Sequence, residues 1–412
     1  MSSISDRSIK SFTLVELLIV IAILAVLAAA VVIVLNPAEL LAQARDSQRI
    51  SDLESLKKSV DIFIVDNPTV SLGTESRVYI SLPDTASNCP NLTATLPSLP
   101  SGWQYVCVTA ANLRNTNGTG WVPINFNNIY GGSLIPYLPI DPQNDSSLTK
   151  YYQYIPGTST FELTALMESE KQSKAAAKDG GIDAGRLEVG SDVSLWRAAS
   201  KIIGYWNMDG IIGPITDGQS LFPDLSGTGN NGVSVNVNGS GMNFAEGKTG
   251  QAIQLDGSDD KIEIPYSSTF DCTSGVTVTA WIKTTDASGN ILSKYGISGS
   301  GLSYMLVIGP NASGIVDFYN QGWRRGTRVV NNNAWHHVAG STDGTTWKVY
   351  SDGQLDASGG AAPISISGST TAIGGPNSNS WGGYFGGLID EVLVYCRVLS
   401  DNEVRAIYNS GK

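Results

Sequence analysis

Five aspartates of the C-terminal half are the residues whose type and spacing best suit a metal site. Asp209 ends a predicted strand, Asp256, Asp259 and Asp260 share one tight turn, and Asp390 lies on the last predicted strand. Hard oxygen ligands of this kind, completed by backbone carbonyls, suit calcium. The alternative is that Asp259 and Asp260 only shape the turn.

The residue types that perform hydrolysis are poorly placed. The two histidines, His336 and His337, are adjacent on a predicted strand, so their side chains face opposite ways and cannot chelate a metal together. Asp390 and Glu391 are also consecutive, which predicts opposite faces, whereas retaining glycosidases need carboxyl groups about 5.5 Å apart. We therefore expect a C-terminal half that is not an enzyme.

Three aromatic residues are candidates for ligand contact. Trp323, Trp381 and Tyr384 lie in stretches rich in glycine and asparagine, which predict loops. Flat rings in open loops, with Asn and Arg nearby as hydrogen-bond partners, are typical of sugar-binding sites. The tryptophans on predicted strands are instead assigned to the core: Trp206, Trp281 and Trp335.

The four cysteines form one pair in each half of the chain. Cys89 and Cys107 bracket a proline-rich loop, and Cys272 and Cys396 lie beside predicted strands. No pair has C-x-x-C spacing, which disfavours a zinc or thioredoxin-like site. In an oxidising compartment both pairs are expected to be disulfides, the alternative being buried free thiols. The second bridge requires strands 276–283 and 387–396 to be antiparallel neighbours.

Composition limits the class of protein. A chain of 412 residues predicts two or three domains at roughly 150 residues each. Only 15% of the residues are charged and 45 are glycine, which favours strands and turns over helices. The net charge of −11 argues against nucleic acid as a partner, because a phosphate backbone needs a basic surface.

The N-terminus carries a long apolar segment. Residues 1–11 are polar, and residues 12–35 are apolar except for Thr13 and Glu16. As a helix, residues 12–35 would be about 36 Å long, enough to cross a bilayer core of about 30 Å. The segment is too long for an ordinary secretory signal. Glu16 should have a partner, because a buried carboxylate costs several kcal/mol.

The rest of the chain divides by its pattern. Residues 36–66 continue as an amphipathic helix with an apolar stripe formed by Leu53, Leu56, Val60 and Phe63. Residues 67–197 form a small globular domain and a linker. Residues 198–412 contain many short strands of alternating polarity between Gly, Asn, Ser and Asp turns, which predicts an all-β sandwich.

The string Lys10-Ser11-Phe12-Thr13-Leu14-Val15-Glu16 resembles the prepilin motif of type IV pilins and type II secretion pseudopilins. The resemblance implies cleavage between Ser11 and Phe12 by a prepilin peptidase, N-methylation of Phe12, and an α+β domain in which the long helix packs on a small antiparallel sheet. It also implies that Glu16 pairs with the α-amino group of Phe12 in a neighbouring subunit. Here Ser11 occupies the place of the usual glycine.

The same family suggests a second cation site. In pseudopilins the loop that precedes the last strands often binds calcium, and Asp141, Asn144 and Asp145 could supply oxygens here. The loop lacks the usual aromatic residue and glycine, so we expect a solvated turn.

The C-terminal half resembles laminin G-like, concanavalin A-like jelly rolls along residues 202–410. The resemblance is carried by YWNMD (205–209), GKTGQAIQLDGSDDKIEIP (247–265), WHHVA (335–339) and GLIDEVLVYCRVLSDNEV (387–404). In this fold the first and last strands are often neighbours. Many relatives hold a structural calcium at such positions, which implies a site formed by Asp209, Asp256, Asp260 and Asp390. The family binds sugars, proteins or no known ligand.

Three functions fit these patterns. The preferred one is a minor pilin-like subunit, membrane-bound before assembly, that displays a non-catalytic jelly roll at the cell surface for adhesion to a glycan or protein. The second is a secretion pseudopilin whose jelly roll docks cargo, and the third is a tethered glycan-active enzyme. The first two imply other pilin or pseudopilin subunits and the membrane as partners.

Overall fold

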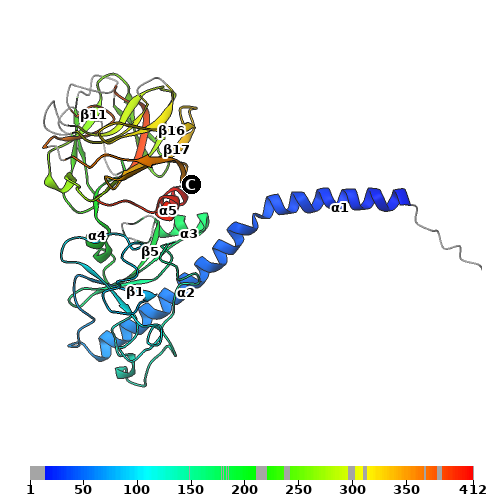
Figure 1. Cartoon of the computed structure of the whole chain (residues 1–412), viewed down its shortest axis with the longest axis vertical. Coiled ribbons are helices and arrows are strands. Elements are labelled where there is room, and N and C mark those ends of the chain that lie inside the picture. Colours follow the sequence, from blue (N-terminus) through cyan, green and yellow to red (C-terminus); the bar gives the residue numbers. More distant parts are fainter. Residues whose placement is uncertain are drawn as a thin grey trace, which may run out of the picture.

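The computed structural model describes residues 14–411, except for residues 148, 178, 180, 182, 184, 210–219, 236–241, 296–301, 310–312, 366–367 and 378–382. The side chains of residues 26–35, 197–198 and 302 also lie outside the description. The described chain forms a protruding helix, an α+β unit and a β-sandwich (Figure 1).

Two consecutive helices begin the described chain. Helix α1 (Leu14–Leu35) is followed by α2 (Pro37–Asp66), and Asn36 between them has a left-handed φ of 38°. Pro37 suits the first helical position because its missing N–H would have no partner there. Helix α2 ends before Pro68, as expected from the sequence.

The predicted apolar stripe of α2 is buried. Leu53, Leu56, Val60 and Phe63 are each at most 1% exposed and join the core beneath a five-stranded sheet in the described chain. The strands run in the order β2-β1-β3-β4-β5. Their bounds, with the two short helices of this unit, are β1 (Arg77–Pro83), β2 (Gln104–Val108), β3 (Gln153–Pro156), β4 (Phe161–Leu166), α3 (Glu170–Ala176), β5 (Arg186–Gly190) and α4 (Leu195–Ser200).

The sheet is mixed, so the expected purely antiparallel sheet is wrong. Strands β1 and β2 are parallel, with Arg77 opposite Gln104, whereas the other pairings are antiparallel. Parallel neighbours need a long crossover, and residues 84–103 provide it. The disulfide Cys89–Cys107 ties this crossover to β2, with a Cα–Cα distance of 5.4 Å.

The C-terminal half is the predicted all-β sandwich. Its described strands form two eight-stranded sheets. The first contains β6 (Ile202–Trp206), β9 (Asn243–Glu246), β10 (Gln251–Asp256), β12 (Val276–Lys283), β17 (Trp335–Thr342), β18 (Thr346–Ser351), β19 (Gln354–Gly360) and β21 (Gly386–Tyr395). The second contains β7 (Leu221–Phe222), β8 (Gly232–Val235), β11 (Lys261–Ile264), β13 (Gly289–Tyr295), β14 (Leu302–Ile308), β15 (Ile315–Tyr319), β16 (Trp323–Val329) and β20 (Thr371–Ile373).

The disulfide Cys272–Cys396 lies at one end of the first sheet. Strands β12 and β21 are antiparallel neighbours, with Thr277 opposite Tyr395, as this bridge requires. The Cα atoms of the two cysteines are 5.2 Å apart.

A buried charge cluster joins the two halves. Helix α5 (Asp401–Ser410) begins with the predicted capping box of Ser400 and Glu403 and lies beside α3 of the first unit (Figure 1). Glu403, 3% exposed, pairs with Arg397 at 2.8 Å and with Arg186 of β5 at 3.3 Å. Asn409 donates to the backbone carbonyl of Glu168 at 3.3 Å. Helix α5 is therefore packed against both units.

Candidate functional site

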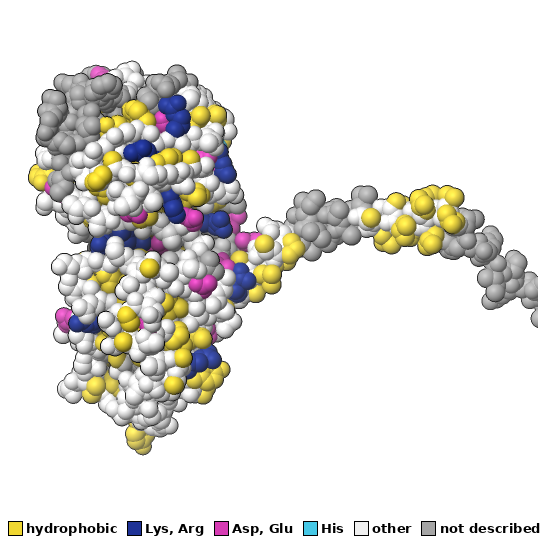
Figure 2. Space-filling view, viewed as in Figure 1, with side chains coloured by type: hydrophobic (Ala, Val, Ile, Leu, Met, Phe, Trp, Pro, Cys, Tyr) yellow, Lys and Arg dark blue, Asp and Glu magenta, His cyan; other side chains and the backbone are white. Residues whose placement is uncertain are grey.

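The acid of the prepilin-like motif lies at the N-terminal end of the protruding helix, away from the globular units (Figure 1). Glu16 is in the first turn of α1, and Ser11 and Phe12 lie outside the described residues. The large apolar side chains of residues 14–24 are between 44% and 78% exposed, and Figure 2 shows apolar side chains along the visible face of this helix. Within the part of the chain whose side chains are described, no helix reaches the length and hydropathy of a membrane span.

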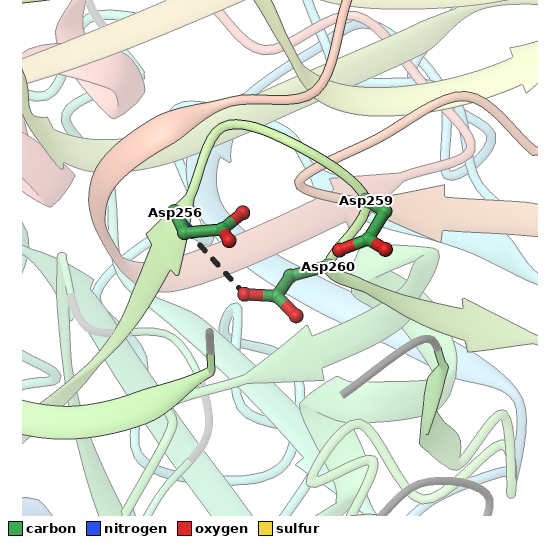
Figure 3. A group of neighbouring side chains, drawn as sticks. All are labelled: Asp256, Asp259 and Asp260. Atoms are coloured by element: carbon green, nitrogen blue, oxygen red, sulfur yellow. Dashed lines mark hydrogen bonds between the residues drawn. The ribbon is translucent and has the colours of Figure 1, made fainter. Parts of the chain in front are cut away.

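Three of the five candidate aspartates form a cluster at the turn between β10 and β11. Asp256, Asp259 and Asp260 each have a carboxylate oxygen within 4.8 Å of the others (Figure 3). Asp260 is fully buried, and its Oδ1 has no hydrogen-bond partner among the described residues. Burial, and then the charge of Asp256, raise the pKa of Asp260 to about 6. A buried carboxylate oxygen of this kind, close to two further carboxylates, suits a hard cation such as calcium.

Asp209 and Asp390 do not join this cluster. Asp209 Oδ1 accepts from the Gln251 amide at 2.6 Å, and Asp390 Oδ2 accepts from the amides of Lys248 and Thr249 at 2.8 and 3.1 Å. Both carboxylates thus hold the turn before β10, whereas Asp256 ends β10. The six residues of β10 extend about 16 Å at roughly 3.3 Å per residue. The expected single site with all four aspartates is therefore wrong.

Asp390 and Glu391 also depart from the sequence-based expectation. Ile389 and Val392 both point into the sandwich core, although regular alternation would place them on opposite faces. The pairing of β12 with β21 shifts at this point, and Glu391 has a φ of 51°, so a β-bulge inserts one residue. Both carboxyl groups consequently lie outside the core, and the expectation that they face opposite ways is wrong.

The two carboxyl groups have different partners. Asp390 accepts from the backbone amides of Lys248, Thr249 and Glu391, the last at 2.8 Å, whereas Glu391 accepts from the hydroxyl of Tyr205 at 2.7 Å. Burial and the neighbouring Glu391 raise the pKa of Asp390 to about 8, and burial raises the pKa of Glu391 to about 7. The backbone bonds of Asp390 give this carboxylate a structural role in the turn.

Trp323 and Tyr384, the two candidate ligand-binding aromatics that the structure describes, do not lie in one site. Trp323 opens strand β16 and does not lie in a loop, and it is 38% exposed. Tyr384 is half-buried before β21, where its ring lies close to Gly375 beyond β20. Strands β16 and β20 are four positions apart in their sheet, about 19 Å at roughly 4.8 Å per strand. Trp381 lies outside the described residues.

The strand tryptophans differ in their surroundings. Trp206 belongs to the sandwich core, as expected, and its ring stacks near Phe270. Trp281 is buried on the outer side of the first sheet, where Tyr408 of α5 stacks on it at 5.5 Å. Trp335 is only half-buried at the start of β17, so its assignment to the core is wrong.

Residues around Trp323 were not identified from the sequence. Tyr319 and Asp317 of β15 lie opposite Trp323 and Arg325 of β16, and these four side chains are called here the β15–β16 face. The rings of Trp323 and Tyr319 meet edge to face at 5.0 Å, and Arg325 Nε lies 3.3 Å from Asp317 Oδ2. The alternating pattern of the two strands indicates the face of each residue but not the register between strands.

The loop before β3 contains a buried ion pair where a solvated turn was expected. Asp141 is 2% exposed, and both of its oxygens accept from Arg49 of α2, at 2.6 and 2.9 Å. Asn144 bonds to Ser81, and Asp145 accepts from Ser147. A guanidinium group thus neutralises Asp141, which is unavailable as a calcium ligand.

Two family models match the chain. Residues 6–32 match the prokaryotic N-terminal methylation motif, and residues 256–405 match the concanavalin A-like lectin/glucanases superfamily. No curated protein matches the chain.

Several solved structures are similar to about half of the chain. Domain 4 of AbnA, a GH43 extracellular arabinanase from Geobacillus stearothermophilus in complex with arabinotriose, is 22% identical with a TM-score of 0.39, over 50% of this chain and 98% of that one. A structure concerning the entry of botulinum neurotoxin type C through two ganglioside molecules is 13% identical with a TM-score of 0.38, over 52% of each chain. Trypanosoma rangeli sialidase is 13% identical with a TM-score of 0.40, over 64% of this chain and 49% of its own.

The methylation motif implies a precursor anchored in the membrane, and the all-β sandwich agrees with the second family model. The chain thus combines an N-terminal prokaryotic methylation motif of the type IV pilin kind with a C-terminal concanavalin A-like domain.

Proposed function

We propose that this protein is a minor pilin-like subunit that assembles through α1 and displays its sandwich as a non-catalytic binding module. The observation that carries the proposal is the joining of a methylation motif to a concanavalin A-like domain in one chain. The exposed apolar side chains of α1 support it, because a helix that is apolar on all sides requires an apolar environment.

Assembly would place α1 among the same helices of other subunits. After removal of residues 1–11, the α-amino group of Phe12 and the carboxylate of Glu16 would neutralise each other between neighbouring subunits. Breaking such a buried pair by removing one partner costs about 3–5 kcal/mol, because the remaining charge has no counter-ion. The unpaired charge would therefore block assembly without affecting processing.

The experiment compares the wild type, Glu16→Ala and the control Glu54→Ala, whose carboxylate is exposed on α2. Intact mass spectrometry of membranes should show loss of residues 1–11 and gain of one methyl group in all three proteins. Wild type and control should enter sheared filaments, and Glu16→Ala should not. Retention of residues 1–11 would contradict the pilin-like assignment. Recovery of processed wild type only in a secretion complex would favour a pseudopilin that docks cargo.

We further propose that the displayed sandwich binds a glycan or a surface protein without cleaving it and holds calcium between Asp256, Asp259 and Asp260. The absence of cleavage is supported by Asp390, whose carboxylate is bonded to the turn between β9 and β10. The calcium site is supported by the unpartnered, buried Oδ1 of Asp260.

A further inference from the structure

The β15–β16 face combines an aromatic ring and a guanidinium group on one side of an edge strand. Trp323 and Arg325 are two residues apart on β16, so their side chains share a face. Their cross-strand partners are Tyr319 and Asp317, while Phe318 between these points into the core. The face is therefore on the outer side of the second sheet.

The side chain of Arg325 contacts a buried carboxylate and is also partly accessible to solvent. Its Nε lies 3.3 Å from Oδ2 of Asp317, which is fully buried, and the Arg325 side chain is 43% exposed. Oδ1 of Asp317 has no hydrogen-bond partner among the described residues. An arginine has five N–H donors, so this single contact leaves the outer edge of Arg325 able to form the paired hydrogen bonds that carboxylates accept.

The exposed charged side chains of strand β16 are arginines, although the protein carries −11 overall. Arg328, three residues further along β16, pairs with Asp356 of β19, and its side chain is 44% exposed. The side chains of Asp317 and Asp356 are 0% and 1% exposed, whereas those of Arg325 and Arg328 are 43% and 44% exposed. An anion that approaches this edge therefore meets the arginines before the covered carboxylates.

Trp323 adds a surface for a ring. It is 38% exposed, and the edge-to-face contact with Tyr319 at 5.0 Å fixes its orientation. An indole held in this way offers apolar area to the C–H face of a sugar, at little cost in side-chain entropy. A free carboxylate alone would use Arg325 but not Trp323.

We propose that the β15–β16 face binds a saccharide unit that carries a carboxylate, either a uronic or a sialic acid, with its ring on Trp323 and its carboxylate on Arg325. This inference rests on the proposed binding function of the sandwich and specifies where the ligand binds and its chemical class. Tyr384 lies too far away to contribute to the same unit.

The test uses the full chain in detergent and isothermal titration with trigalacturonate and 3′-sialyllactose, each compared with its neutral counterpart, trigalactose or lactose. At least one acidic probe should bind about tenfold more tightly than its counterpart, since a bidentate carboxylate contact of about 1.4 kcal/mol has that effect. Binding of trigalacturonate would identify the ligand as a uronic acid, and binding of 3′-sialyllactose would identify it as a sialic acid. Binding of the acidic probe should weaken as salt is added.

Four variants test the residues. Trp323→Ala and Arg325→Ala should each weaken binding of the acidic probe at least tenfold. Arg325→Lys keeps a charge beside Asp317 but removes the planar fork, so it should lose much of the affinity while its thermal unfolding stays close to wild type. Arg405→Ala removes an exposed arginine of α5 and serves as the matched control, with unchanged binding.

Three outcomes would overturn the proposal. They are equal binding of acidic and neutral probes, acidic binding unaffected by Arg325→Lys and Trp323→Ala, and no binding of any probe. Binding of the neutral probes that is unchanged in Trp323→Ala and Arg325→Ala would contradict this site but retain the proposed glycan-binding function. Filament incorporation of the same variants is expected to equal that of wild type, so failure of this inference is distinguishable from failure of the assembly proposal.

Discussion

The guanidinium of Arg49 and the carboxylate of Asp141 form a fully buried pair, with Nε 2.6 Å from Oδ2, and this pair fastens α2 to the loop before β3. Arg49 also contacts Asp46 at 2.7 Å and Glu168, so one guanidinium group binds three carboxylates. The cation on which this loop depends is thus part of the polypeptide, and no bound metal is required at Asp141.

Loss of that cation should destabilise the first unit. Arg49→Met would leave Asp46 and Asp141 buried without a counter-ion, and we expect a loss of about 3–5 kcal/mol in the free energy of unfolding. Urea unfolding of the full chain in detergent measures it. The control Lys57→Met breaks the surface pair with Asp61 and should cost at most about 0.5 kcal/mol. Equal effects of the two variants would contradict the assignment.

Calcium should stabilise the sandwich through the cluster at the β10–β11 turn. A ligand at 100 times its Kd adds about 2.7 kcal/mol to the stability of the folded state, so calcium should raise the Tm and EDTA should reverse the increase. Asp260→Asn should abolish the calcium-dependent shift. The control Asp209→Asn, at the other end of β10, should retain the calcium-dependent shift in Tm. Loss of the shift in this control would indicate that Asp209 and Asp260 contribute to one calcium site.

Both disulfides should be present and should contribute unequally. Mass labelling of the denatured, unreduced protein should find no free thiol among the four cysteines. From the sequence separations of 18 and 124 residues, loss of the bridges by Cys107→Ala and Cys396→Ala should cost about 3 and about 5 kcal/mol. A larger effect of the first substitution would show that loop closure does not control these contributions.

A pair of buried glutamates should make the first unit less stable as the pH rises above about 4.5. Burial raises the pKa of Glu162 from 4.5 to about 7, and burial and then Glu162 raise the pKa of Glu188. Because the folded-state pKa values lie above the unfolded ones, stability falls as the pH rises from about 4.5 through about 7.

Glu162→Gln should remove most of this dependence, because the neutral amide can still accept from the Trp196 amide as Glu162 Oε2 does at 2.6 Å. We expect the variant to exceed wild type by up to about 3 kcal/mol at pH 8 and to match it near pH 4.5. Urea unfolding at both pH values provides the comparison. The control Glu54→Gln, at an exposed position, should have the same free energy of unfolding as wild type at both pH values. If Glu162→Gln also matches wild type at both pH values, the buried glutamates do not cause the pH dependence.

The contact between Arg186 and Glu403 should couple the two units energetically. A double-mutant cycle of Arg186→Met and Glu403→Gln should give a coupling of about 0.5–3 kcal/mol in the free energy of unfolding. Asp401 lies on the same helix but pairs with Lys348 of β18, so a cycle of Arg186→Met with Asp401→Asn should give no coupling. Similar values in both cycles would indicate a general effect of α5.

Sequence patterns predicted the elements of this protein better than their pairing. Local periodicity predicted the apolar stripe of α2 and the strands of the sandwich, and a local capping motif predicted the start of α5. The structure confirms all three. The opposite orientations expected for His336 and His337 also follow from strand alternation, but the full burial of His337 does not, because its ring is covered by Tyr408 of α5. The parallel pairing of β1 and β2 was not predictable, because crossover direction leaves no local pattern.

The candidate sites were harder to predict because they depend on register. The bulge at Glu391 changes the side of the sheet on which one carboxylate lies. Asp209 and Asp256 lie at opposite ends of β10, so the length of that strand separates them. Arg325 could be connected with Trp323 by alternation along β16, but its buried partner Asp317 is determined by pairing with β15. The ion pair of Arg49 and Asp141 joins residues 92 positions apart, and neither residue signals the other in the sequence.

The contact between Arg186 and Glu403 can form only late in the synthesis of the chain. The two residues are 217 positions apart, so at roughly 5–20 residues per second the carboxylate follows the guanidinium by about 10–40 s. During that interval Arg186 must remain hydrated or rely on Asp183, 3.3 Å away in the finished fold. The edge of the first unit at β5 is therefore completed only after the whole sandwich has been synthesised, and a chaperone or protease can reach it until then.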